Sequence, residues 1–141
     1  MVPRPPGTLI TAQEISFNYT ADPLSFSAFR TYSNEVLSST QGHPIIFESQ
    51  DIRIKTALPP NPNIYGLGEH TDSSRSPSIN NYTRTVWSQD VYGVPNNTNL
   101  HGSHPIHVEH CPTGTHGVFL LNYNGMDIKI SQSGTSTSLE Y

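Results

Sequence analysis

Two acids and two bases lie together in the stretch NIYGLGEHTDSSR, residues 63–75: Glu69, His70, Asp72 and Arg75. Two glycines give the same stretch freedom to turn tightly. The pattern fits an active site, a metal site, a loop that serves another active site, or a solvated turn. The chain holds 11 acidic residues, so two acids on neighbouring loops mean little by themselves. We expect Glu69 and Asp72 to be solvated turn acids that accept hydrogen bonds from backbone amides.

Other catalytic patterns are weak. Glycoside hydrolysis commonly needs two carboxylic acids that face each other across the scissile bond, and no spacing here identifies such a pair. Gly66 and Gly68 form a G-x-G-E stretch without the third glycine of a dinucleotide loop, and no nucleophile elbow or P-loop occurs. The one cysteine, Cys111, neighbours His110 only in sequence. The residues by themselves predict no catalytic group.

Four histidines recur at every third position in HGSHPIHVEH: His101, His104, His107 and His110. On a strand, residues three apart point to opposite faces, and those six apart are separated by ~20 Å. One zinc ion needs its ligands within ~2 Å. We therefore expect no metal site and no cofactor, and interpret these histidines as edge and loop residues in ordinary hydrogen bonds.

Composition limits the partners and the compartment. A net charge of -4, without a cluster of Lys and Arg, argues against nucleic-acid binding. The apolar runs are too short to span a bilayer, and the N-terminus lacks the apolar stretch of a signal peptide. Three N-x-S/T sequons favour a secreted, glycosylated parent protein, with Asn18, Asn81 and Asn96 as acceptors.

Alternating apolar and polar residues predict strands over 15–19, 24–33 and 44–58 after a tail at 1–14. In the last of these, Ile52, Ile54 and Thr56 would share one face. The proline-rich residues 59–63 predict a connector. Residues 71–99 predict a long loop, with a possible hairpin arm at 83–93.

The clearest local signal is GVFLLNYNGMDIKI, residues 117–130, where Asn124-Gly125 separates two strand-like runs and favours a type I′ hairpin. No window shows helical periodicity. We predict an all-β chain, an antiparallel β-sandwich.

Four ordered motifs carry a family resemblance: NIYGLGEHTDSSR, TRTVWSQDVYG, TNLHGSHPI and HGVFLLNYNGMDIKI. In this order they resemble the galactose mutarotase-like, N-terminal β-sandwich domain of glycoside hydrolase family 31, above all that of its fungal α-glucosidases. The likeness extends from Ile15 to Tyr141.

The resemblance implies a role outside catalysis. Members of the family hydrolyse α-glycosidic bonds with two aspartates on a (β/α)₈ barrel that follows this domain. No barrel and no nucleophile motif are found in this sequence. We therefore expect residues 15–141 to be a partial N-terminal domain, incomplete at one or both ends and inactive alone. A stand-alone carbohydrate-binding module and a docking piece for a separate barrel are the alternatives.

The resemblance also suggests site residues. In the family, a loop of the sandwich reaches over the active-site pocket, and the aspartate of its W-x-x-D stretch contacts sugar. That stretch here is residues 87–90. Asp90 is thus the expected substrate contact, Gln89 a neighbouring polar contact and Trp87 a packing anchor that buries its indole. His101 and His107 stand where the family commonly has aromatic residues.

Overall fold

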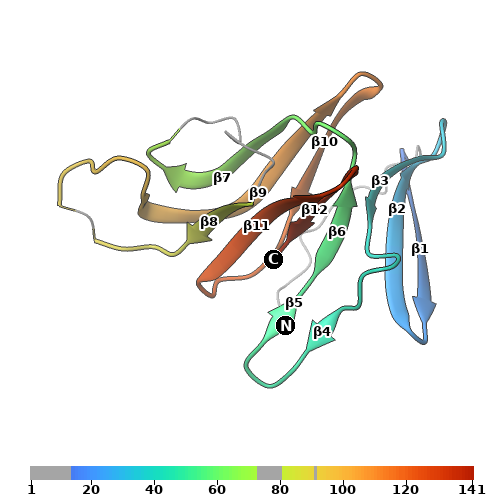
Figure 1. The fold of residues 1–141 in the computed structure, drawn as a ribbon, viewed down its shortest axis with the longest axis horizontal. Coiled ribbons are helices and arrows are strands. Elements are labelled where there is room, and N and C mark those ends of the chain that lie inside the picture. The colour runs from blue at the N-terminus through green and yellow to red at the C-terminus, as the bar shows by residue number, and fades with distance from the viewer. Residues whose placement is uncertain (1–13, 73–80, 91) are drawn as a thin grey trace, which may run out of the picture.

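The computed structural model describes residues 14–72, 81–90 and 92–141, and every regular element in these ranges is a β-strand (Figure 1). Among these residues no helix is long and apolar enough to cross a membrane. The strands pair only in antiparallel fashion. The all-β, antiparallel prediction is confirmed.

The strands form four sheets. One contains β1 (Ile15–Ala21), β2 (Leu24–Arg30) and β3 (Glu35–Ser39) in that order. A second has the order β10 (Gly114–Phe119), β9 (Asn99–Cys111) and β7 (Ile64–His70). The third has the order β6 (Lys55–Leu58), β12 (Ser136–Glu140), β11 (Met126–Ser133) and β8 (Tyr82–Val86). The fourth is the small hairpin of β4 (Ile46–Phe47) and β5 (Ile52–Arg53).

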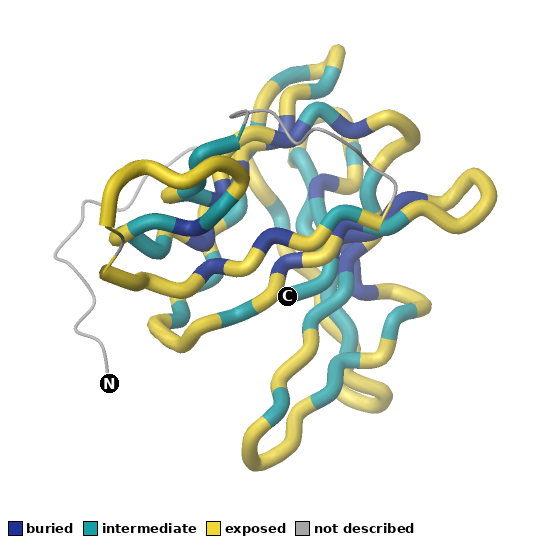
Figure 2. Tube along the Cα trace, turned by 60° about the vertical axis from the view of Figure 1, so that its left-hand side comes forward, coloured by how far each residue is buried: buried dark blue, intermediate teal, exposed yellow. Residues whose placement is uncertain are grey.

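The hydrophobic core lies between β7 and the four-stranded sheet. Its buried side chains are Ile64, Leu67, Val86, Ile128, Ile130 and Leu139. Alternation assigns the two faces: on β11, Ile128 and Ile130 point inward while Asp127 and Lys129 face solvent. Figure 2 shows the buried segments near the middle of the molecule and the loops exposed around them. Each fully buried Ile or Leu contributes roughly 1.5–3 kcal/mol, which holds β7 and β8 in place beside each other.

The hairpin predicted around Asn124-Gly125 is wrong. β10 pairs with β9, and β11 pairs with β8 and β12, so residues 120–125 cross from one sheet to another. Neither Asn124 nor Gly125 is among the described residues with positive φ. The tight two-residue turns lie instead at 22–23, 112–113 and 134–135. Alternation marks both runs as strands but does not say which strand each one pairs with.

The single strand predicted over residues 44–58 is also wrong. The chain folds back between β4 and β5 and only then enters β6. Ile52 is exposed and Thr56 is buried, so the two do not share a face as expected. The connector at 59–63 lies outside the strands, as predicted. β8 pairs with β11, and it is no hairpin arm of its own.

Strand β7 contains the glycine-rich stretch that the sequence suggested was a loop. Gly66, Gly68, Glu69 and His70 lie within it, and its register against β9 shifts twice. Gly66 has a φ of +99°, and a Cβ there would come within 2.6 Å of the Ile106 carbonyl oxygen. Only glycine allows β7 to approach β9 so closely.

Candidate functional site

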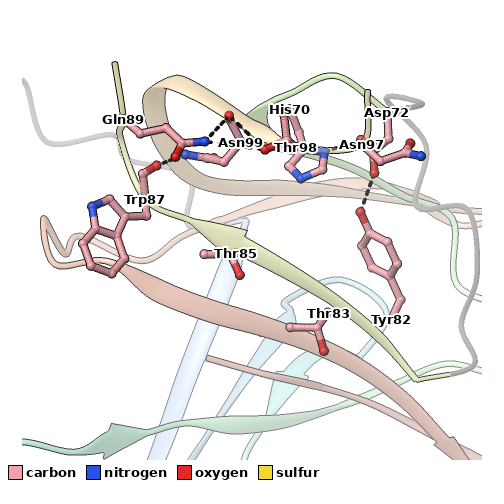
Figure 3. Close-up of a pocket in the computed structure, with 10 residues that line it drawn as sticks. All are labelled: His70, Asp72, Tyr82, Thr83, Thr85, Trp87, Gln89, Asn97, Thr98 and Asn99. Carbon is pink, nitrogen blue, oxygen red and sulfur yellow. Dashed lines mark hydrogen bonds and ion pairs between the residues drawn. The ribbon is translucent and has the colours of Figure 1, made fainter. Parts of the chain in front are cut away.

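A polar cleft of about 800 Å³ opens along β8, between the end of β7 and the beginning of β9. Three of its side chains come from alternate positions, Thr83, Thr85 and Trp87, which are all exposed while Arg84 and Val86 between them are buried. This two-residue period places the three on one face. Figure 3 shows the described residues that line the cleft: His70, Asp72, Tyr82, Thr83, Thr85, Trp87, Gln89, Asn97, Thr98 and Asn99.

A nearly buried ion pair forms one end of the cleft. The Arg84 and Asp72 side chains are 3% and 9% exposed, and Arg84 Nη2 donates to Asp72 Oδ1. The Tyr82 hydroxyl donates to Asp72 Oδ2. Burial raises the pKa of the Asp72 carboxyl, but the hydrogen bonds from Tyr82 and Arg84 outweigh it and the net pKa is lowered. Asp72 is therefore no solvated turn acid, and that prediction is wrong.

Arg84 also joins β8 to β7. Its Nη1 donates to the carbonyl oxygens of Gly66 and Leu67 at 2.7 and 3.3 Å, and its Nε donates to the Tyr82 hydroxyl oxygen at 2.8 Å. The irregular backbone of β7 leaves these carbonyls free to accept from a side chain. The guanidinium thus fixes the wall of the cleft while it neutralises Asp72.

The other residues of the first motif do not gather into a catalytic group. Glu69 is exposed on β7, and its Oε2 accepts from the Gly102 backbone N–H at 3.0 Å, so the expected bond to a backbone amide is present. His70 Nδ1 lies 3.1 Å from Asp72 Oδ1. Arg75 lies outside the described residues.

Trp87 does not bury its indole, and the predicted packing anchor is wrong. The residue is 67% exposed. One side of the ring lies against the backbone of Gly125, where an added Cβ would be 3.3 Å from Trp87 Cδ2. The absence of a side chain at Gly125 lets the indole approach the chain this closely, and Trp87 also lines the cleft.

Backbone and side-chain amides tie the segment after β8 to the start of β9 through hydrogen bonds. The Gln89 N–H donates to the Leu100 carbonyl at 3.2 Å, and Gln89 Nε2 donates to the Asn99 carbonyl at 2.9 Å. Asn99 Nδ2 donates to the Trp87 carbonyl. Asn99 is only 6% exposed, and its Oδ1 is buried without a hydrogen-bond partner. Gln89 therefore lines the cleft in a fixed position.

The carboxylate of Asp90 lies in solvent. Its Oδ1 is 3.7 Å from Nε2 of the exposed His101, and Asp90 is not among the residues that line the cleft. Thr83, Thr85, Asn97, Thr98 and Asn99 line it, although the sequence analysis did not select them. The alternation in TRTVW was the one signal that could have identified the first two.

A second polar cluster is buried within the three-stranded sheet of β7, β9 and β10. His107 is 3% exposed, and its Nδ1 is 2.8 Å from the Tyr141 hydroxyl. Burial, and then the charge of His116, lower the pKa of His107 to about 4. Burial raises the pKa of Glu109, whose Oε2 lies 3.5 Å from His116 Nε2.

This cluster corrects the interpretation of all four recurring histidines as edge and loop residues. His107 is buried and His101 is exposed because the register shifts opposite β7 rotate the two ends of β9 against each other. Within the described residues, no three or more His, Cys, Asp and Glu side chains could hold a metal ion. Burial raises the pKa of the Cys111 thiol, so it is not an activated nucleophile.

The three sequon asparagines are exposed. Asn18 lies on β1, Asn81 immediately before β8 and Asn96 on the segment between β8 and β9. Each is accessible for modification, and glycosylation itself stays a prediction.

Comparison with known proteins adds to this geometry. The glycosyl hydrolase 31 N-terminal galactose mutarotase-like domain matches residues 6–128. A probable alpha/beta-glucosidase from Aspergillus clavatus is 52% identical over 120 residues, which are 84% of this chain and 13% of that protein. Alpha-xylosidase 1 from Arabidopsis thaliana is 38% identical over 128 residues, 84% of this chain and 14% of that protein.

A solved structure shares the fold. The GH31 dextranase of Flavobacterium johnsoniae, complexed with glucose, superposes with a TM-score of 0.68 at 22% identity, over 92% of this chain and 15% of that one. The chain thus spans about one seventh of the length of these relatives. With a match over most of its residues and a shared strand architecture, the chain belongs to the family of glycosyl hydrolase 31 N-terminal galactose mutarotase-like domains.

Proposed function

We propose that this chain is the non-catalytic N-terminal domain of an α-glucosidase-like hydrolase and contributes the segment around Gln89 and Asp90 to substrate binding. The relatives named as glucosidases and a xylosidase support a sugar substrate. The catalytic aspartates belong to a barrel outside this sequence, so the domain supplies contacts and not chemistry. A parent protein that is secreted and glycosylated forms part of the same proposal.

One observation carries the role of Asp90. The backbone before Asp90 is tied to β9 through Gln89, yet the Asp90 carboxylate itself extends into solvent, 3.7 Å from Nε2 of the exposed His101. A carboxylate held on an anchored segment can accept hydrogen bonds from sugar hydroxyls without a large loss of entropy. Each bond to a charged group contributes about 1.5–3 kcal/mol.

The test uses a complete glucosidase of the family in which this chain replaces the corresponding domain. Changing Asp90→Ala should raise KM or lower kcat about tenfold or more, because ~1.4 kcal/mol corresponds to one decade. Glu48→Ala, which removes an exposed carboxylate between β4 and β5, is the matched control and should leave both constants unchanged. Equal kinetics for the two variants would remove Asp90 from the substrate site.

A further inference from the structure

We propose that the cleft along β8 binds one neutral sugar ring on this domain itself, with the Trp87 indole as the stacking platform. The inference deepens the proposed function and rests on it for the ligand class, an α-glucoside. The site is distinct from the Asp90 contact, since Asp90 lies outside the cleft lining. The two can therefore be tested separately.

The platform is the first observation. A tryptophan that is 67% exposed leaves a large apolar face in water. Gly125 supports the ring from one side, and Trp87 lines the cleft, so the exposed part of the indole is available to a ligand there. A pyranose presents a face of C–H groups that covers such a ring and keeps its hydroxyls at the rim.

The rim is the second observation. Thr83 and Thr85 project from the same face as Trp87, and alternate side chains on a strand are about 6–7 Å apart, which a single sugar ring spans. The Thr85 hydroxyl donates to Asp127 Oδ1 at 2.7 Å, so its lone pairs remain able to accept from a ligand. Gln89 also lines the cleft, and its side-chain amide points toward Asn99 (Figure 3).

The third observation is an acceptor without a donor. Asn99 is 6% exposed and lines the cleft, and its Oδ1 makes no hydrogen bond in the described structure. A buried acceptor left unpaired is unfavourable. A rotation of the Asn99 side chain would bring this buried oxygen to the cleft, where a sugar hydroxyl can donate to it.

The charges around the cleft favour a neutral ligand. Among the described residues of the lining, Asp72 is the one carboxylate, and it is paired with Arg84. Apart from Asp72 and His70, these described residues supply hydroxyls, amides and two aromatic rings. Hydroxyls and amides can both donate and accept, which suits a polyhydroxy compound better than a phosphate or a carboxylate.

The single tryptophan of the chain makes the test direct, because all indole emission comes from Trp87. The 141-residue chain is titrated with glucose, maltose and isomaltose up to about 100 mM. We expect a saturable change in emission with Kd near the millimolar range, as for a ligand of one or two rings. Sorbitol, an acyclic polyol, should give no saturable change.

Variants test the location. Thr85→Lys puts a long charged side chain into the cleft from an exposed position and should weaken sugar binding about tenfold or more. Thr115→Lys is the matched control on an exposed position of β10 and should bind within twofold of the parent. Trp87→Ala should abolish sugar-induced NMR shifts, whereas Tyr92→Ala, which removes an exposed aromatic on the same segment, should retain them.

Three results would overturn the inference: no saturable response in a chain with a β-type circular dichroism spectrum, equal responses of Thr85→Lys and Thr115→Lys, or an equal response to sorbitol. Asp90→Ala should leave this titration unchanged. If Asp90→Ala leaves the glucosidase constants unchanged while the sugar titration saturates, only the Asp90 contact is rejected. If Asp90→Ala changes those constants while the titration shows no saturable response, only the cleft is rejected.

Discussion

The ion pair of Arg84 and Asp72 gives the sharpest prediction about stability. Replacing Arg84→Met keeps the length of the side chain but leaves the Asp72 carboxylate, 9% exposed, without its cation. It also removes the donor to the carbonyls of Gly66 and Leu67. Removing one partner of a buried ion pair costs about 3–5 kcal/mol, which is a fifth or more of a typical domain stability of ~5–15 kcal/mol.

Urea unfolding at pH 7, followed by circular dichroism and by Trp87 emission, measures this loss. Coincidence of the two probes tests for two-state unfolding. Adding Asp72→Asn to Arg84→Met removes the unpaired charge. The double variant should therefore lose less stability than the two single variants together, by at least ~1 kcal/mol.

Arg53→Met provides the matched control, because Arg53 pairs with Asp51 at the surface, where both side chains are well exposed. Surface pairs contribute little, and this change should leave the urea midpoint unaltered. The pH dependence adds a second check. The folded pKa of Asp72 is lowered, so its contribution is present above the unfolded value of ~3.9 and lost as pH falls through the folded value. An Arg84→Met midpoint close to that of Arg53→Met would refute the reasoning.

Three further predictions follow from the sequence and the buried cluster. The chain alone should not hydrolyse p-nitrophenyl α-glucoside above a mock preparation, because retaining hydrolysis needs two carboxyl groups ~5 Å apart; measurable turnover would contradict this. The pKa of His107 is about 4 in the folded chain, against ~6.5 in the unfolded chain. The neutral form of His107 therefore contributes about 3 kcal/mol to stability at pH 7, and this contribution is lost as the pH falls from 6.5 to 4. His107→Phe should make the urea midpoint less dependent on pH between 6.5 and 4. The raised pKa of Glu109 changes stability in the opposite direction over this range. An unchanged pH dependence in His107→Phe would reject the role given to His107. Secretion from yeast should yield a glycoprotein, and Asn→Gln at each sequon should remove one glycan by mass spectrometry: Asn18, Asn81 and Asn96.

The sequence predicted the fold class and the family because both rest on strand periodicity and on ordered motifs. The sequence did not predict which strands pair with one another. The Asn124-Gly125 dipeptide satisfies hairpin chemistry, but β10 and β11 find partners in different sheets. Local sequence carries no information about that choice.

The site was predicted only in part for a similar reason. Gln89 lines the cleft, and its contact with substrate, like that of Asp90, stays a prediction. The burial of Asp72 depends on Arg84, 12 residues away, and the exposure of Trp87 depends on Gly125, in a strand connection far along the chain. Such partners come together only in the tertiary structure, and no pattern within one segment identifies them.

The register shifts between β7 and β9 have a consequence for how the two ends of β9 vary over evolutionary time. A one-residue slip in a regular ladder would turn every following side chain to the opposite face. The irregular pairing opposite Gly66 and Gly68 already contains such a break, so an insertion or deletion near residues 100–103 can be absorbed there. His107 and Glu109 would keep their buried positions while the Asn99 end changes length. β9 can thus remodel its cleft end without disturbing its buried end.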